Sequence, residues 1–206
     1  MMKKTILFQG DSITDCGRVS GAGGGMGCGY PAMILARLMC DQPEAEWNII
    51  NRGTSGNRIV DLYARWRVDC LNLNPDVLSI LVGVNDTWHE DNQNGVEVPR
   101  YARFYRELLE WTLKARPGVR LVLMEPFICA QNEKLEIMLA DVRQRAEVVK
   151  SLAKEFDAVF IPLQSVFEAA SQRAPMAHWA ADGVHPTPAG HQLIADAWLN
   201  LTPWQG

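Results

Sequence analysis

Residues 5–15 read Thr5-Ile6-Leu7-Phe8-Gln9-Gly10-Asp11-Ser12-Ile13-Thr14-Asp15, and this stretch sets the fold of the chain. Its first half is continuously apolar, without the alternation of a half-exposed strand, which predicts a strand buried on both faces. Its second half passes through a glycine into small polar residues, so we expect the strand to end there. Runs of the same kind recur at residues 47–51, 77–82, 120–124 and 158–161.

Helical patterns fill the intervals between these runs, at residues 30–40, 59–72, 100–115, 135–156, 166–172 and 189–200. Strands that alternate with helices predict a parallel sheet covered on both sides, here a three-layer α/β/α sandwich with five strands. Because no repeat or linker divides the 206 residues, we expect one domain over residues 1–206. In such sheets ligands bind beyond the carboxyl ends of the strands, so we look for the functional site there.

Composition narrows the classes of function. The net charge is -4 and no block of Lys and Arg occurs, which disfavours nucleic acid as a partner because phosphate neutralisation needs clustered cations. The first apolar run is too short for a signal peptide and no run reaches membrane length, so we place the chain in the cytoplasm without a membrane partner. Five scattered cysteines predict reduced thiols, and we expect neither a metal nor a cofactor.

Three residues from opposite ends of the chain have the chemistry of a nucleophilic site. Ser12 follows the first strand, and Asp182-Gly183-Val184-His185-Pro186 places a histidine shortly after an aspartate. A serine hydroxyl needs a base to remove its proton, and the base works best when a carboxylate fixes its tautomer. We therefore predict Ser12, His185 and Asp182 as a catalytic triad.

Acyl transfer also needs hydrogen-bond donors for the oxygen that becomes negative in the transition state. Two polar segments that follow predicted strands offer them: Asn51-Arg52-Gly53-Thr54-Ser55-Gly56-Asn57 and Gly83-Val84-Asn85-Asp86. Gly53 lets a backbone N–H approach a substrate closely, and Asn85 has a side-chain amide. We predict an oxyanion hole formed by the N–H groups of Ser12 and Gly53 and the amide of Asn85.

At these residues the chain resembles the GDSL, or SGNH, hydrolases, named for a Ser, a Gly, an Asn and a His in four separated blocks. The blocks match Ser12, Gly53, Asn85 and His185, while Ile13 stands where the name-giving motif has leucine. The resemblance implies a flavodoxin-like fold and a serine esterase. Longer strings at residues 10–18, 55–57, 64–66, 184–186 and 189–191 look like those of the intracellular acetylxylan esterases.

Several other residues could either serve this site or be structural. Ser55 lacks a nucleophile-elbow motif and Ser151 lies in a long helical pattern, so we predict both to be structural. Asp11 is predicted to hold the turn before the nucleophile by accepting backbone N–H bonds, with a substrate contact as the alternative. Trp88 and Trp179 lie in the catalytic loops and are candidates to stack on a sugar ring or an acyl group.

Two further features are interpreted as parts of the cleft or the surface. The segment from Gly17 to Gly29 contains seven glycines but no phosphate-binding fingerprint, so we predict a flexible rim of the active site. His89 and His178 could line the cleft, and for His89 we prefer a solvated position. Trp204 in the C-terminal tail must dock on the protein's own surface or at a subunit interface, which leaves a homo-oligomer open.

The segment after Asn85 is polar with one aromatic residue, which suits a sugar better than a long acyl chain. We therefore predict an esterase that deacetylates acetylated sugars, such as short xylo-oligosaccharides, through an acyl-enzyme intermediate. Two alternatives remain at this point. One is a lysophospholipase or thioesterase, which the same four blocks also serve, and the other is a catalytically silent carbohydrate-binding module.

Overall fold

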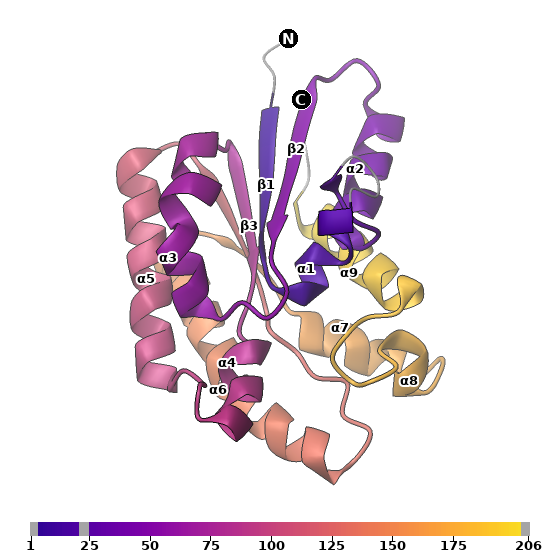
Figure 1. The fold of residues 1–206 in the computed structure, drawn as a ribbon. Coiled ribbons are helices and arrows are strands. Elements are labelled where there is room, and N and C mark those ends of the chain that lie inside the picture. Colours follow the sequence, from indigo (N-terminus) through magenta and orange to yellow (C-terminus); the bar gives the residue numbers. More distant parts are fainter. Residues whose placement is uncertain (1–3, 21–24, 203–206) are drawn as a thin grey trace.

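All five predicted strands are present and form one parallel sheet in the order β2-β1-β3-β4-β5 (Figure 1). The structure is a computed structural model that describes residues 4–20 and 25–202; part of the predicted glycine-rich rim, and Trp204, lie outside these residues. The strands are β1 (Lys4–Gly10), β2 (Trp47–Gly53), β3 (Val77–Leu81), β4 (Arg120–Met124) and β5 (Val159–Ile161).

The six predicted helices are also present, each with bounds close to those expected. They are α2 (Tyr30–Asp41), α3 (Ile59–Asp69), α5 (Val98–Ala115), α6 (Glu133–Glu155), α7 (Leu163–Ala170) and α9 (Pro188–Leu201). Three short helices were not predicted: α1 (Ser12–Asp15), α4 (Val84–Trp88) and α8 (Met176–Trp179). Single 3₁₀ turns add η1 (Arg18–Ser20), η3 (Leu71–Leu73) and η4 (His89–Asn92). Helices of four or five residues are too short to produce a hydrophobic period.

The sheet has a core on each face, which explains its continuously apolar strands. Along β1, Ile6 and Phe8 pack into one core and Leu7 packs into the other. Helices α2, α7 and α9 cover the first face, and α3, α5 and α6 cover the second (Figure 1). The predicted three-layer α/β/α sandwich is therefore confirmed.

Local sequence signals fix the ends of the helices that flank the site. The Asn132 side chain accepts a hydrogen bond from the Leu135 N–H at the start of α6, and Thr187 accepts one from the Gly190 N–H at the start of α9. Pro188 occupies the first turn of α9, where no helical N–H bond is lost. These caps set where α6 begins and where the chain leaves the loop that contains His185.

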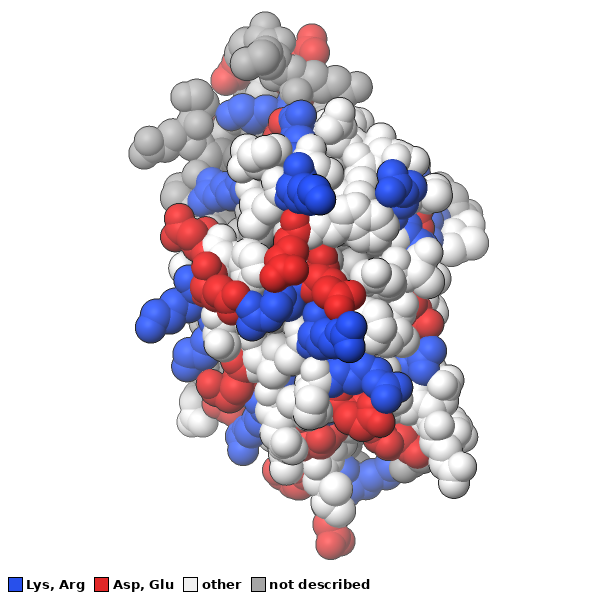
Figure 2. All heavy atoms as spheres, turned by 90° about the vertical axis from the view of Figure 1, so that its left-hand side faces the viewer, with Lys and Arg blue, Asp and Glu red and all other residues white. Residues whose placement is uncertain are grey.

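The outer face formed by α3 and α5 is strongly charged. Figure 2 shows Lys and Arg side chains interspersed with Asp and Glu side chains across this face. On α5, Arg103 pairs with Glu107 one turn away at 2.9 Å. Among the helices in the described residues, none is both long and apolar enough to cross a membrane.

The strand register brings three chain segments together at one edge of the sheet. Gly10, the last residue of β1, pairs with Gly53 of β2 and with Leu81 of β3. The strand order reverses direction between β1 and β3, and a doubly wound sheet opens a crevice at such a point. The segments that follow β1, β2 and β3 therefore meet where a ligand can bind.

Candidate active site

Ser12, His185 and Asp182 form a hydrogen-bonded row beyond the carboxyl end of β1. The Ser12 Oγ lies 2.9 Å from the His185 Nε2, and the His185 Nδ1 lies 2.7 Å from the Asp182 Oδ2. The structure thus brings together all three residues of the predicted triad, although the serine and the histidine are 173 positions apart. This geometry allows the imidazole to accept the serine proton while the carboxylate holds the proton on Nδ1.

The carboxylate of Asp182 is itself held by the loop. Its Oδ1 accepts hydrogen bonds from the backbone N–H groups of Val184, at 2.9 Å, and His185, at 2.7 Å. Partial burial raises the pKa of Asp182, but these N–H groups and the imidazole outweigh burial, so its pKa lies below the ordinary value. The Asp182 carboxylate is therefore ionised at neutral pH, and its Oδ2 is held facing the imidazole of His185.

Asp11 directly precedes Ser12 and holds the short helix that begins there. Its side chain caps α1 by accepting a hydrogen bond from the Ile13 N–H at 3.0 Å, as the turn interpretation predicted. Burial raises its pKa to about 7, against the opposing effects of that N–H and of His185. Asp11 borders the active-site pocket but is 1% exposed, so the structure favours a capping role over a substrate contact.

The prediction that Gly53 donates to the oxyanion is wrong in this structure. Its N–H already donates to the Asn51 Oδ1 at 2.8 Å, and the residue is buried. The space beside its Cα is filled by the backbone of Asp15 and by Thr14, with the Asp15 N only 2.3 Å from where a Cβ would lie. Gly53 is a glycine because α1 packs against the end of β2, and its N–H does not face a substrate.

Gly56 is the glycine that borders the pocket. Its backbone has a φ of +81°, a conformation that favours glycine, and the space beside its Cα is open. Among the residues that the structure describes, none accepts a hydrogen bond from the Gly56 N–H. The sequence alone does not separate the two glycines, because both follow the strand predicted at residues 47–51. In the structure β2 extends to Gly53, and Gly56 lies in the turn after it.

Asn85 lies in the pocket, in the first turn of α4. One N–H of its amide donates to the Asn57 carbonyl at 3.1 Å, which fixes the side chain and leaves the second N–H available. The Ser12 N–H lies in the first turn of α1, where a helix provides no acceptor. The donors near Ser12 are thus its own N–H, the Gly56 N–H and the Asn85 amide.

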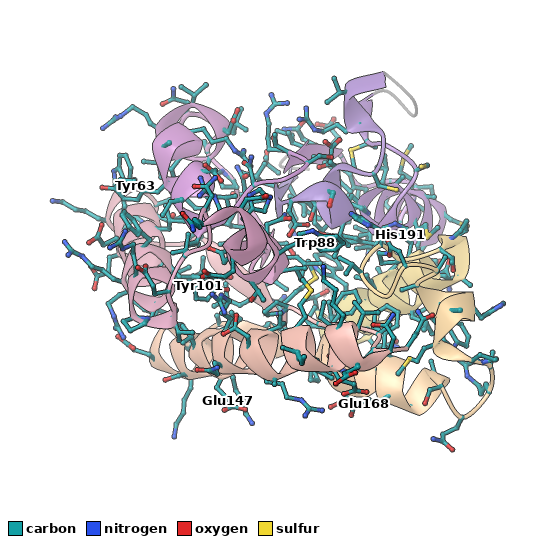
Figure 3. The ribbon with its side chains drawn as sticks, turned by 60° about the horizontal axis from the view of Figure 1, so that its bottom comes forward. Tyr63, Trp88, Tyr101, Glu147, Glu168 and His191 are labelled. Carbon is teal, nitrogen blue, oxygen red and sulfur yellow. The ribbon has the colours of Figure 1, made fainter. Side chains whose placement is uncertain are left out.

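The pocket around Ser12 has a volume of about 320 Å³ and mixed polar and apolar walls. Trp88 is 40% exposed, and its ring lies 6.1 Å from the His185 ring between centroids. Figure 3 labels Trp88, which lies on α4 and borders the pocket. His89 also lines the pocket, contrary to the solvated position preferred above. Ser55 is nearby, but its hydroxyl donates to the Asp15 carboxylate at 3.1 Å, so it serves the structure.

Trp179 does not contact this pocket, which corrects the expectation of a substrate contact. Its side chain packs in the core on the α9 side of the sheet and is 7% exposed. Its indole N–H donates to the Ala174 carbonyl at 3.2 Å, and Arg173 lies over its ring. The sequence could not separate Trp179 from Trp88, because both are aromatic residues close to catalytic motifs.

A larger groove of about 760 Å³ lies beside the pocket, between α4 and the first turns of α6. Trp88 borders both cavities, and Asp182 also lines the groove. Its remaining walls combine polar and apolar side chains: Thr87, Glu90, Asn132, Glu133, Lys134, Leu135, Ile137, Met138 and Asp141. Within residues 4–20 and 25–202, no three His, Cys, Asp or Glu side chains are arranged to hold a metal ion.

A doubly wound sheet that carries a serine, a histidine and an aspartate in one hydrogen-bonded row defines an α/β serine hydrolase. The chain belongs to the GDSL-like lipase/acylhydrolase family, whose profile it matches over residues 8–193. The resemblance seen in the sequence is therefore confirmed, and the protein is an ester hydrolase. The alternative of a silent binding module is not supported.

Individual relatives cover nearly the whole chain. An acetylxylan esterase from Geobacillus stearothermophilus is 36% identical over 204 residues, which span 94% of this chain and 91% of the relative. The crystal structure of Axe2, an acetylxylan esterase from the same organism, has a TM-score of 0.89 at 35% identity and covers 98% of this chain and 95% of its own. A GDSL-like lipase from Parabacteroides merdae has a TM-score of 0.89 at 39% identity, with 98% and 97% covered.

Proposed function

We propose that this esterase removes acetyl groups from acetylated sugars, with short xylo-oligosaccharides as the substrate class. The observation that carries the proposal is the pairing of a small pocket at Ser12 with a larger, partly polar groove beside His185. The acetylxylan esterases among the relatives support the same substrate class.

The proposed mechanism uses the row of hydrogen bonds at Ser12. As the Ser12 Oγ attacks the ester carbonyl, its proton passes to the His185 Nε2, and Asp182 stabilises the resulting imidazolium. The carbonyl oxygen becomes negative and is held by the N–H groups of Ser12 and Gly56 and by the Asn85 amide. His185 then protonates the departing alcohol, and water repeats the sequence to release the acid.

The direction of proton transfer indicates on which side of the site the leaving alcohol lies. The alcohol oxygen takes its proton from the His185 Nε2, so the body of the alcohol leaves on the side of the imidazole. There Trp88 offers an exposed ring, and the groove continues beyond it. The wall of the groove is more apolar than polar, and Glu90 and Lys134 add polar groups that suit the hydroxyl groups of a sugar.

Two substrate series test the proposal. The first is hydrolysis of p-nitrophenyl esters from acetate to long acyl chains, run in parallel on the wild type and on Ser12→Ala. We expect activity confined to short acyl groups and absent from the variant. A maximum at long chains would instead indicate a lysophospholipase or thioesterase, and activity that survives in Ser12→Ala would exclude Ser12 as the nucleophile.

The second series compares acetylated xylotriose with ethyl acetate, whose alcohol is too short to reach the groove. Ile137 is an exposed residue of the groove, and Ile137→Trp should obstruct it without disturbing the core. We expect kcat/KM to fall for the acetylated sugar and to stay unchanged for ethyl acetate. Lys150→Trp, at an exposed position of the same helix outside the groove, is the matched control. Equal effects on both esters would contradict a sugar site in the groove.

A further inference from the structure

Two cysteines that the sequence leaves unrelated lie side by side in the fold. Cys16 ends α1 and Cys28 precedes α2, and their Sγ atoms are 3.4 Å apart. The Cys28 N–H donates to the Cys16 carbonyl at 2.8 Å, so the two backbones are adjacent as well. Both cysteines are free, and we call them the thiol pair.

The geometry of the thiol pair is close to that of a disulfide. A disulfide requires a sulfur separation of about 2.05 Å, so the two Sγ atoms must approach by a little over an ångström. The backbone hydrogen bond already fixes the neighbouring main chains, and rotation of the exposed Cys28 side chain can supply part of the approach. Bond formation therefore requires no rearrangement of the sheet.

A buried histidine, His191, faces the Cys16 thiol. The His191 Nδ1 accepts the Tyr30 N–H at 3.2 Å, so the ring proton lies on Nε2, 3.3 Å from the Cys16 Sγ. Burial, and then the charge of His185, lower the pKa of His191 to about 4, so the ring is neutral. Figure 3 labels His191 on α9, where this helix meets the N-terminal segment. Its N–H donates to the Cys16 sulfur, which holds this thiol in place beside Cys28.

The two thiols differ in a way that assigns their roles. Cys28 is exposed, whereas Cys16 is half-buried, and burial together with the neighbouring Cys28 thiol raises the pKa of Cys16 to about 11. An incoming reagent therefore reaches Cys28 first, and Cys16 remains protonated until the second step.

We propose that Cys16 and Cys28 form a reversible disulfide by exchange with a small-molecule disulfide such as oxidised glutathione. The Cys28 thiol loses its proton and attacks one glutathione sulfur, which breaks the glutathione S–S bond and releases the first glutathione thiolate. Cys16 then loses its proton and attacks the Cys28 sulfur, which releases the second thiolate. Both thiolates take up protons, so two cysteine thiols are oxidised and one glutathione disulfide is reduced to two thiols.

The bond would act directly beside the nucleophile. The Cys16 N–H donates to the Ser12 carbonyl at 2.9 Å, so Cys16 closes the short helix that begins with the catalytic serine. Gly27, next to Cys28, packs closely against α1: a Cβ at this position would lie 2.5 Å from the Asp15 carbonyl oxygen. The disulfide fastens residues 27 and 28 to α1.

The test is incubation of the folded, reduced protein with a series of ratios of reduced to oxidised glutathione, followed by acid quenching and peptide mass mapping. Cys40→Ser is the matched control, because Cys40 is the other exposed cysteine. We expect the wild type and Cys40→Ser to lose two thiols as a Cys16–Cys28 crosslink. The crosslink should exceed the mixed disulfide at Cys40 on the order of tenfold, since its second step is intramolecular.

Two variants separate the proposed steps. Cys16→Ser should accumulate glutathione on Cys28, because the resolving thiol is missing, and Cys28→Ser should form no crosslink. A wild type that keeps glutathione on Cys28 with Cys16 reduced would overturn the proposal. So would a wild type in which both cysteines stay reduced while Cys40 reacts. Both wild-type outcomes are independent of how well either variant folds.

Discussion

Replacing Asp182 with asparagine should remove nearly all activity while preserving the fold. The Asp182 Oδ1 holds two backbone N–H groups, so the only oxygen of the new amide must occupy that position. The NH₂ group then replaces Oδ2 and points at the His185 Nδ1, 2.7 Å away. A donor there forces the ring proton onto Nε2, and the imidazole can no longer accept the Ser12 proton.

The expected loss of kcat is on the order of 10⁴, or about 5 kcal/mol of activation free energy. The assay is p-nitrophenyl acetate hydrolysis, accompanied by thermal unfolding, which should stay close to wild type because both loop hydrogen bonds survive. A proton NMR spectrum should also lose the downfield Nδ1–H signal of His185. A loss below tenfold in a folded variant would refute the tautomer argument.

Three further outcomes are expected. Asn85→Ala should lower kcat about a hundredfold or more on p-nitrophenyl acetate with little change in KM, and an unchanged rate would remove Asn85 from the oxyanion hole. Burial raises the pKa of Asp86 to about 8, so the stability that its proton provides is complete below the ordinary value of 3.8 and is lost as pH rises towards 8. Urea unfolding between about pH 5 and pH 9 should therefore show a smaller decline for Asp86→Asn than for wild type, and parallel curves would contradict this. Oxidation of the thiol pair, 12 positions apart, should stabilise the fold by about 3 kcal/mol, visible as a higher Tm that is absent in Cys28→Ser.

The long elements were predictable because their patterns are local. Continuous apolar runs identified the strands, and the intervening periodicity identified the long helices. The helix predicted over residues 135–156, for example, is α6 (Glu133–Glu155). The short helix α1 depends instead on one cap, the Asp11 side chain, and α4 has no side-chain cap at its start. Nothing in a window of four or five residues distinguishes such a helix from a turn.

The oxyanion donors show where motif reading fails. Gly53 and Gly56 lie in the same block. Close packing requires a glycine at Gly53 and a positive φ favours one at Gly56, but only the structure shows that the Gly53 N–H is already used by Asn51. The sequence also could not tell that Trp88 is exposed whereas Trp179 is buried in the core on the α9 side of the sheet, because burial depends on packing between distant segments. The contact between Cys16 and Cys28 depends on the path of the intervening chain, which their spacing does not encode.

The separation of 173 positions between Ser12 and His185 also sets when this enzyme can first act during its own synthesis. The nucleophile and both strands that flank β1 are made early, but the base is placed by the loop before α9, which leaves the ribosome late. A nascent chain can therefore form most of its sheet before it has esterase activity. We expect hydrolysis to begin only when α9 has docked against α2 and α7, so the onset of activity would report this docking step.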